Sequence, residues 1–90
     1  MNVLFDRSFQ KDIEAVRDTT ILGKLEIVIV EIKNASRLTD IKNITQMTDN
    51  HGYYRVKVGA YRIGLRFTDQ KVIFERFLNR KDIYKYFPRP

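Results

Sequence analysis

Residues 53–67, with the sequence YYRVKVGAYRIGLRF, constrain the fold most, because apolar and cationic side chains alternate along both halves of the segment. A period of two is typical of strands that bury one face. Gly59 and Ala60 separate the halves, and a glycine at the first position of a two-residue loop favours a type II′ turn. The segment therefore predicts a β-hairpin. The expected pairs are Val58 with Tyr61, Val56 with Ile63 and Tyr54 with Leu65 on an apolar face, and Lys57 with Arg62, Arg55 with Gly64 and Tyr53 with Arg66 on a cationic face.

The cationic face of this hairpin brings like charges together. We expect Lys57 directly opposite Arg62, with Arg55 diagonal to both and little bulk at Gly64. Cations in opposing positions destabilise a sheet, so a bound polyanion explains the pattern better than solubility does. The alternative is a solvated strand face, which is the usual meaning of alternating charge.

The charge of the chain is unevenly distributed. Its 90 residues, 43% of them hydrophobic, suffice for one modest core, so we expect residues 1–90 to form a single domain. Residues 1–52 contain 7 Lys or Arg and 8 Asp or Glu, a net charge of −1, whereas residues 53–90 contain 10 and 3, a net charge of +7. Such a local surplus indicates nucleic acid, an acidic protein segment or an anionic membrane as the partner.

Composition argues against several classes of protein. No apolar run approaches the length of a bilayer span and the first residues lack the regions of a signal peptide, so membrane is the weakest of the three partners. The lack of cysteine excludes a disulfide framework and a thiol nucleophile, and one histidine, His51, is too few for a zinc site. We expect a cytoplasmic protein without metal or cofactor, in which His51 is an exposed loop residue.

The first residues predict a short strand and a helix. Residues 3–5 suit a strand, and Ser8 is an N-cap candidate for a helix whose apolar positions are Phe9, Ile13 and Val16.

A second helix is predicted to begin at a cap formed by Thr19 or Thr20. Apolar residues then recur at helical spacing over four turns. They are Ile21, Leu25, Val28, Ile32 and Ala35. Residues 26–32, EIVIVEI, are rich enough in β-branched side chains to suit a buried strand instead. We favour the helix because the longer periodic run is harder to produce by chance.

The remaining segments complete an α+β fold. Residues 34–52 are expected to form a packed connection or an irregular strand, and residues 71–78 a strand whose register is uncertain because Asp69-Gln70 is a poor tight-turn pair. Residues 81–87 predict a short helix that ends before Pro88. The expected architecture is two N-terminal helices packed on one face of a small twisted, mainly antiparallel sheet, with a short C-terminal helix and with the opposite face open to a ligand.

Residues 54–63, YRVKVGAYRI, and residues 79–84, NRKDIY, form a pair of motifs in the basic half of the chain. The first resembles the hairpin pattern YRxRxGxYRxxY of the RelE/ParE superfamily of bacterial toxins, and the second is similar to that superfamily's closing pattern HRRxxY. Asn79 replaces a frequent histidine, and Arg55 stands where the RelE branch often has lysine. The RelE branch is favoured because five residues stand at matching positions. They are Arg55, Lys57, Arg62, Arg80 and Tyr84.

The resemblance implies the toxin of a type II toxin–antitoxin pair, which cuts mRNA on the ribosome. Cleavage without metal requires removal of a proton from the 2′-hydroxyl, stabilisation of charge on the phosphate and protonation of the departing 5′-oxygen. Arginine is a poor base because its pKa exceeds about 12, so Lys57 is the better candidate if neighbouring cations disfavour its charged form. Arg55 and Arg62 would hold the phosphate oxygens, Arg80 would assist the leaving oxygen, and Tyr84 would stack on or orient a base.

Other residues have supporting roles in this hypothesis. Arg66, Lys81 and Tyr53 are expected to bind RNA, the two cations through phosphate attraction, without taking part in the chemistry. Glu75 is an alternative base, although it is better explained as a counter-charge to an arginine.

Tyr84 also has a structural alternative. It shares helical spacing with Ile83 and Phe87, so all three residues suit the buried side of the last helix, which would leave Tyr86 as the exposed tyrosine.

Two other functions stay open from the sequence. ParE-type members of the superfamily inhibit DNA gyrase and cleave no RNA, and an inactive member would use its basic face only to bind an antitoxin. The expected partners are an acidic, partly disordered antitoxin in a hetero-oligomeric complex, together with the ribosome and mRNA.

Overall fold

The computed structural model describes residues 1–48 and 51–88. The predicted hairpin is present: β3 (Tyr53–Val58) and β4 (Tyr61–Thr68) pair in the expected register throughout. Gly59 has a φ of 58°, the sign that the first position of a type II′ turn requires and that glycine adopts without steric cost. The alternation of side chains therefore determined this part of the fold.

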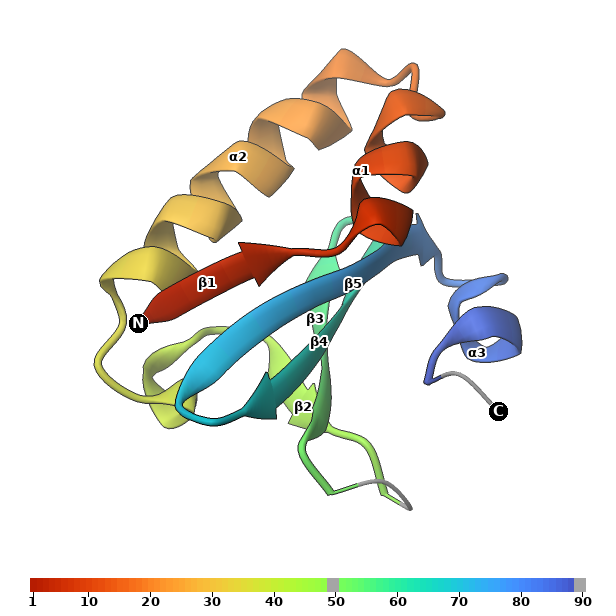
Figure 1. The fold of residues 1–90 in the computed structure, drawn as a ribbon. Helices are drawn as coiled ribbons and strands as arrows, with labels where there is room; N and C mark the ends of the chain where they lie inside the picture. The colour runs from red at the N-terminus through yellow and green to blue at the C-terminus, as the bar shows by residue number, and fades with distance from the viewer. Residues whose placement is uncertain (49–50, 89–90) are drawn as a thin grey trace.

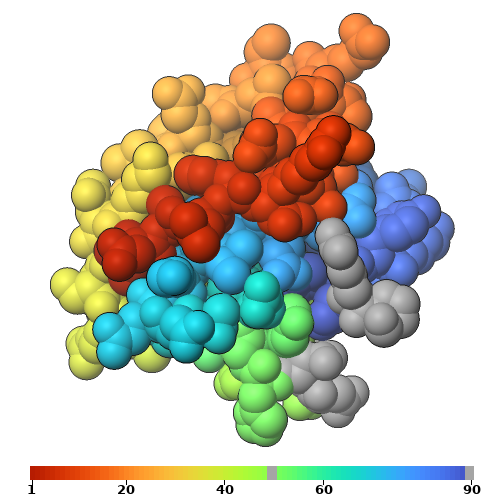
Figure 2. Space-filling view, viewed as in Figure 1, coloured from red at the N-terminus to blue at the C-terminus, as the bar shows by residue number. Residues whose placement is uncertain are grey.

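The hairpin is the centre of a mixed sheet. In the described part of the chain the strand order is β1-β5-β4-β3-β2, with β1 (Asn2–Phe5), β2 (Ile44–Gln46) and β5 (Lys71–Asn79) completing the sheet. β1 runs parallel to β5, and every other neighbouring pair is antiparallel. Figure 2 shows atoms of β1 and α1 (red) lying against those of β5 (blue). The α+β class and the mainly antiparallel sheet are thus confirmed.

The β4–β5 connection is a tight turn followed by a bulge. Asp69 and Gln70 have φ values of 50° and 61°, both positive as in a type I′ turn, and Thr68 pairs with Lys71. Farther along, the register passes from Leu65 opposite Phe74 to Gly64 opposite Arg76, so Glu75 is an extra residue in β5. Phe74 and Phe77 are consequently both buried although they lie three positions apart.

The two N-terminal helices are α1 (Arg7–Glu14) and α2 (Thr19–Asn34). The predicted caps are wrong by one or two positions. The Asp6 carboxylate accepts from the Ser8 amide at 3.2 Å, and Asp18 Oδ1 accepts from the amides of Thr20 and Ile21 at 2.9 and 3.2 Å. A carboxylate serves here because it also interacts favourably with the positive end of the helix dipole.

Figure 1 shows α1 and α2 together on one side of the sheet. The helical interpretation of residues 26–32 is confirmed, since Ile21, Leu25 and Ile32 of the predicted stripe are buried in the core. They pack with Val56, Ile63 and the other inward side chains of the hairpin. No helix within the described residues has both the length and the hydropathy to cross a membrane.

Residues 35–48 form a connection that contains one short 3-10 helix, η1 (Leu38–Asp40), before β2. β2 pairs with β3 through Ile44 opposite Val56 and Thr45 opposite Arg55. The irregular strand expected in this region is therefore present.

The sheet face opposite α1 and α2 is not fully open, which corrects the sequence-based expectation. The chain returns across it as α3 (Ile83–Tyr86) and Phe87, and both Ile83 and Phe87 are buried. A Cβ atom built on Gly64 would lie 2.7–2.8 Å from three ring atoms of Phe87, so the ring rests directly on the backbone of β4. Only glycine leaves room for this contact, and no local sequence pattern announces it.

Candidate functional site

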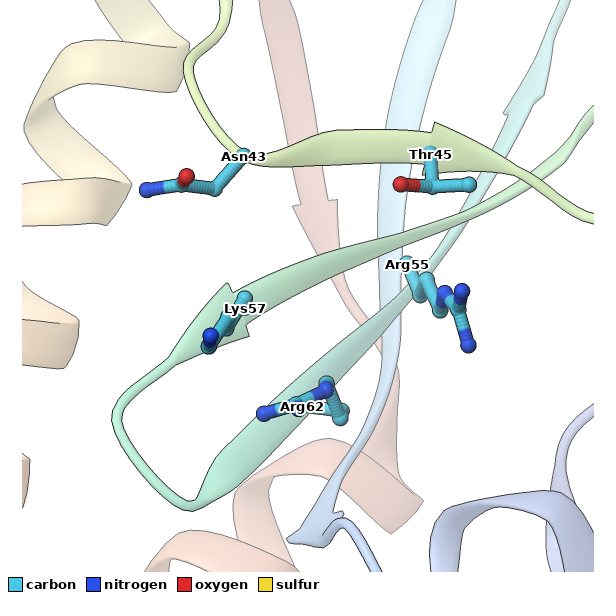
Figure 3. A pocket seen from close by; sticks show the side chains of 5 residues that line it. All are labelled: Asn43, Thr45, Arg55, Lys57 and Arg62. Carbon is cyan, nitrogen blue, oxygen red and sulfur yellow. The ribbon is translucent and has the colours of Figure 1, made fainter.

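Three cationic side chains of the hairpin line one pocket on the sheet face opposite α1 and α2. The pocket has a volume of about 220 Å³ and is lined by Asn43, Thr45, Arg55, Lys57 and Arg62 (Figure 3). Arg55 and Lys57 alternate along β3, and Lys57 stands opposite Arg62 of β4. The structure thus brings together the three hairpin cations that the sequence singled out, and we call this site the cationic pocket.

The sequence did not identify Asn43 and Thr45 as pocket residues. Both come from the chain at β2, where Thr45 pairs with Arg55 and the carbonyl of Asn43 accepts from the Lys57 amide at 3.1 Å. Only the pairing of β2 with β3 could have identified these two residues, because residues opposite one another in a sheet lie on the same face.

Arg62 is held in place by the hairpin loop. Its Nη1 atom donates to the carbonyl oxygens of Gly59 and Tyr61 at 3.0 and 2.8 Å. Burial, followed by the charges of Arg55 and Arg80, lowers the pKa of Arg62 from its ordinary value. Burial and the neighbouring cations therefore both disfavour the charged form of Arg62, and an anion in the pocket would offset this effect.

Lys57 differs from Arg62 in being exposed. Its side chain extends beside that of Arg62 in Figure 3. An exposed ammonium at the edge of a concave site is well placed to meet a ligand, and the neighbouring guanidinium groups are well placed to grip planar oxyanions.

Arg80 lies beside the cationic pocket but does not line it. Its amide donates to the carbonyl of Ala60 at 2.8 Å, which ties the end of β5 to the hairpin loop, and its charge acts on Arg62. Lys81 is exposed in the following turn, where its amide donates to Asn79 Oδ1 at 3.0 Å. Arg80 is therefore a neighbour of the site, and Lys81 lies farther along the same segment.

Tyr84 of α3 lies next to Arg55. The residue is 52% exposed, and the Cζ atom of Arg55 lies 5.3 Å from the centroid of its ring, a cation–π geometry. The structural alternative for Tyr84 is wrong, because Ile83 and Phe87 are the buried residues of this segment. Tyr86 is exposed as well, so α3 presents two aromatic rings rather than one.

Arg66, Tyr53 and Glu75 belong to a second pocket, of about 260 Å³, which Asp6 completes. Arg66 Nε donates to Glu75 Oε2 at 2.7 Å, and this hydrogen bond is the main cause of the raised pKa of Arg66. The interpretation of Glu75 as a counter-charge to an arginine is confirmed. As a base for the cationic pocket Glu75 is badly placed, since it does not line that pocket.

The remaining expectations concern His51 and metals. His51 is exposed. Among residues 1–48 and 51–88, no three His, Cys, Asp or Glu side chains gather closely enough to hold a metal ion.

This fold and this pocket define a class: a small α+β protein that presents guanidinium and ammonium groups from the sheet face opposite its two N-terminal helices. Residues 3–84 match the family model described as the ParE toxin of the type II toxin–antitoxin system, parDE. The chain therefore belongs to the ParE toxin family of type II toxin–antitoxin systems and is a RelE-like toxin.

The RelE likeness comes from individual relatives. Toxin RelE3 of Methanocaldococcus jannaschii is 42% identical over 89 residues, which are 98% of this chain and 100% of that protein. The RelB–RelE antitoxin–toxin complex from Methanococcus jannaschii contains a chain of 38% identity, with a TM-score of 0.79 over 94% of this chain and 99% of that one. YafQ of E. coli, at 19% identity and a TM-score of 0.66 over 92% and 97% of the two chains, shares the fold.

Proposed function

We propose that this toxin is a ribosome-dependent mRNA endoribonuclease that acts in the cytoplasm without a metal ion. The observation that carries the proposal is the cationic pocket, in which Arg55, Lys57 and Arg62 converge beside the exposed ring of Tyr84. Three cations around a concave site suit a phosphate, and an exposed aromatic ring suits an unpaired base. The identity to Toxin RelE3 supports the same conclusion.

The proposed chemistry assigns one task to each group. Lys57 serves as the base that takes the proton of a 2′-hydroxyl, and the 2′-oxygen attacks the adjacent phosphorus. Arg55 and Arg62 hold the non-bridging oxygens as negative charge develops on them. The bond from phosphorus to the 5′-oxygen breaks, and Arg80, directly or through a water, supports protonation of that oxygen. The products are a 2′,3′-cyclic phosphate and a 5′-hydroxyl.

Tyr84 and the outlying residues position the message. Tyr84 stacks on or orients a base beside the scissile phosphate. Lys81, exposed after β5, attracts the RNA backbone. Tyr53 and Arg66 contact RNA without reacting.

An antitoxin is the second proposed partner. The solved complexes of relatives pair RelE with RelB, YafQ with DinJ and YoeB with YefM. We infer that this chain likewise forms a hetero-oligomer with a cognate antitoxin, whose acidic segment is attracted by the surplus of positive charge in residues 53–90.

Primer extension on translated mRNA tests the nuclease proposal. Wild-type protein is expected to produce discrete 5′ ends, and Lys57→Ala and Arg62→Ala are each expected to reduce cleavage by about 100-fold or more, the scale of a lost acid–base or electrostatic contribution. Arg37→Ala is the matched control, because Arg37 is 77% exposed and lines a different hollow. Undiminished cleavage by either pocket variant refutes the assigned roles.

A second candidate follows from the matching family model, which bears the name of the ParE toxins. By the resemblance, a ParE-like toxin inhibits DNA gyrase without cutting RNA. Accumulation of gyrase cleavage complexes on supercoiled plasmid, with mRNA left intact, decides for this candidate.

A further inference from the structure

The second pocket, lined by Asp6, Tyr53, Arg66 and Glu75, lies on the same sheet face as the cationic pocket, and we call it the Arg66–Glu75 pocket. Tyr53 precedes Arg55 by two residues on β3, so both side chains point to this face, and Tyr53 stands opposite Arg66. The Phe87 ring separates the two pockets, since it rests on Gly64 and meets the Tyr53 ring edge-on with centroids 5.7 Å apart.

The charges of the two pockets are opposite in sign. Arg55, Lys57 and Arg62 give the cationic pocket a formal charge of +3. In the Arg66–Glu75 pocket the formal charge is +1 from Arg66 and −1 each from Glu75 and Asp6, a sum of −1. A phosphate group is repelled by such a site, so the expected phosphate attraction by Arg66 is a poor explanation of this pocket. A neutral group that forms hydrogen bonds fits it better.

The hydrogen-bonding groups of the pocket match the edge of a nucleobase. A guanidinium carries five N–H donors and a carboxylate about four acceptor sites, and the Nε–Oε2 hydrogen bond uses one of each. Further donors of Arg66 therefore lie next to further acceptors of Glu75, and both can bind a ligand. Arg66 is 37% exposed and Glu75 16% exposed, so a ligand reaches both without unfolding the sheet. Tyr53 adds an aromatic ring, and stacking combined with hydrogen bonds to base edges is how proteins read unpaired RNA.

The spacing of the pockets suits neighbouring nucleotides. Two residues along a strand span about 7 Å, so Tyr53 and Arg55 are separated by roughly the length of one extended nucleotide. We propose that the Arg66–Glu75 pocket is a base-reading subsite, which receives one base of the message next to the nucleotide whose phosphate enters the cationic pocket. A base whose phosphate is held in the cationic pocket turns its edge to this pocket in one orientation, with one edge position against the Arg66 guanidinium and the next against the Glu75 carboxylate. The keto bases, guanine and uracil, present an acceptor and a donor in that order, and the amino bases, adenine and cytosine, present them in the reverse order. The subsite therefore distinguishes the two kinds of base. This inference rests on the proposed function.

Cleavage of mRNAs that carry a randomised codon, translated by purified ribosomes with the full-length protein, tests the subsite. Wild-type protein is expected to show a keto or amino preference at one position near the cut. Glu75→Gln replaces an acceptor-only group with an amide that also donates, and is expected to change the keto-to-amino ratio of cleavage rates at that position by about 5- to 150-fold. Asp40→Asn is the control for the same change of chemistry elsewhere, because Asp40 forms a longer and more exposed ion pair with Arg37 away from both pockets, and its ratio should equal that of wild type.

The outcomes separate the subsite from the nuclease. An unchanged ratio in Glu75→Gln, or a loss of rate that is equal at every codon, overturns the subsite and leaves the nuclease standing. Wild-type protein that cuts no message overturns both. If Glu75→Gln lowers the Tm enough to prevent the assay, Arg66→Lys, which keeps the charge but removes the planar fork, must change the same ratio, and the proposal fails if it does not.

Discussion

Gly64→Ala is the substitution whose effect follows most directly from the structure. The added Cβ would lie 2.7 Å from two ring atoms of Phe87 and 2.8 Å from a third, whereas carbon atoms prefer about 3.5–4.0 Å. The Phe87 ring must therefore move by roughly 1 Å away from the sheet. Its freedom to do so is small, because the residue is 1% exposed and its amide donates to the carbonyl of Ile83 at 2.8 Å.

The expected cost is that of overpacking a core. Inserting a methyl group into a filled site lowers the free energy of unfolding by about 1–3 kcal/mol. For a chain of this length each kcal/mol lowers the Tm by about 4–8 °C. Movement of Phe87 also displaces Tyr84 of the same segment from Arg55, so mRNA cleavage should fall together with stability.

A double-mutant cycle in urea measures this clash. In a Phe87→Ala background the ring is absent, so Gly64→Ala should cost almost nothing, which gives a coupling energy of about 1–3 kcal/mol. Gly23→Ala is the matched control, since nothing lies within 4 Å of a Cβ built there in α2. That change should stabilise the protein by about 0.5–1 kcal/mol, because alanine is the better helix former.

The reasoning is refuted if Gly64→Ala destabilises the Phe87→Ala protein as much as it destabilises wild type. The cost would then arise in β4 itself and not from contact with the returning chain.

Three further predictions concern caps, ion pairs and salt. Asp18→Ala removes the α2 cap and should lower the free energy of unfolding by about 0.5–2 kcal/mol in urea titrations, whereas Thr19→Ala should change it by less than about 0.5 kcal/mol. Asp12→Ala deprives the Phe77 amide and the Arg76 guanidinium of their acceptor and should cost about 1.5–3 kcal/mol in the same titration. Lys57→Ala should reduce the slope of log affinity against log salt for single-stranded RNA by about 0.7, measured by fluorescence anisotropy, and an unchanged slope would exclude a phosphate contact by Lys57.

The parts of the fold that the sequence predicted are those governed by local periodicity. The register of the hairpin follows from alternation around Gly59, and α2 follows from an apolar stripe long enough to outweigh its β-branched residues. The N-caps were missed because the side chains of Asp, Ser and Thr accept the same hydrogen bond from the first turn of a helix. The sequence alone therefore does not decide whether Asp18 or Thr19 is the N-cap of α2.

The parts that escaped prediction depend on contacts between distant segments. Thr45 enters the cationic pocket only through pairing with β3, and Phe87 crosses the sheet only because Gly64 offers a flat surface. The sequence predicted that Glu75 is a counter-charge to an arginine, but it did not identify Arg66 as that arginine. The separation of this ion pair from the cationic pocket depends on the position of Phe87. Local patterns therefore identified the charged residues, and tertiary packing separated Arg66 and Glu75 from the cationic pocket.

The extra residue at Glu75 also marks the place where β5 tolerates a change in length. Deleting it would restore even alternation in β5 and leave Arg76 opposite Gly64 and Phe77 opposite Ile63, so Phe77 would stay in the core. The segment that carries Arg80 and Tyr84 would then begin from the same side of the sheet, and the loss would fall on the ion pair of Glu75 with Arg66. Alignments of related toxins should accordingly accept one residue more or less between hairpin and closing motif, because such a change at the bulge leaves both motifs on the same face of the sheet.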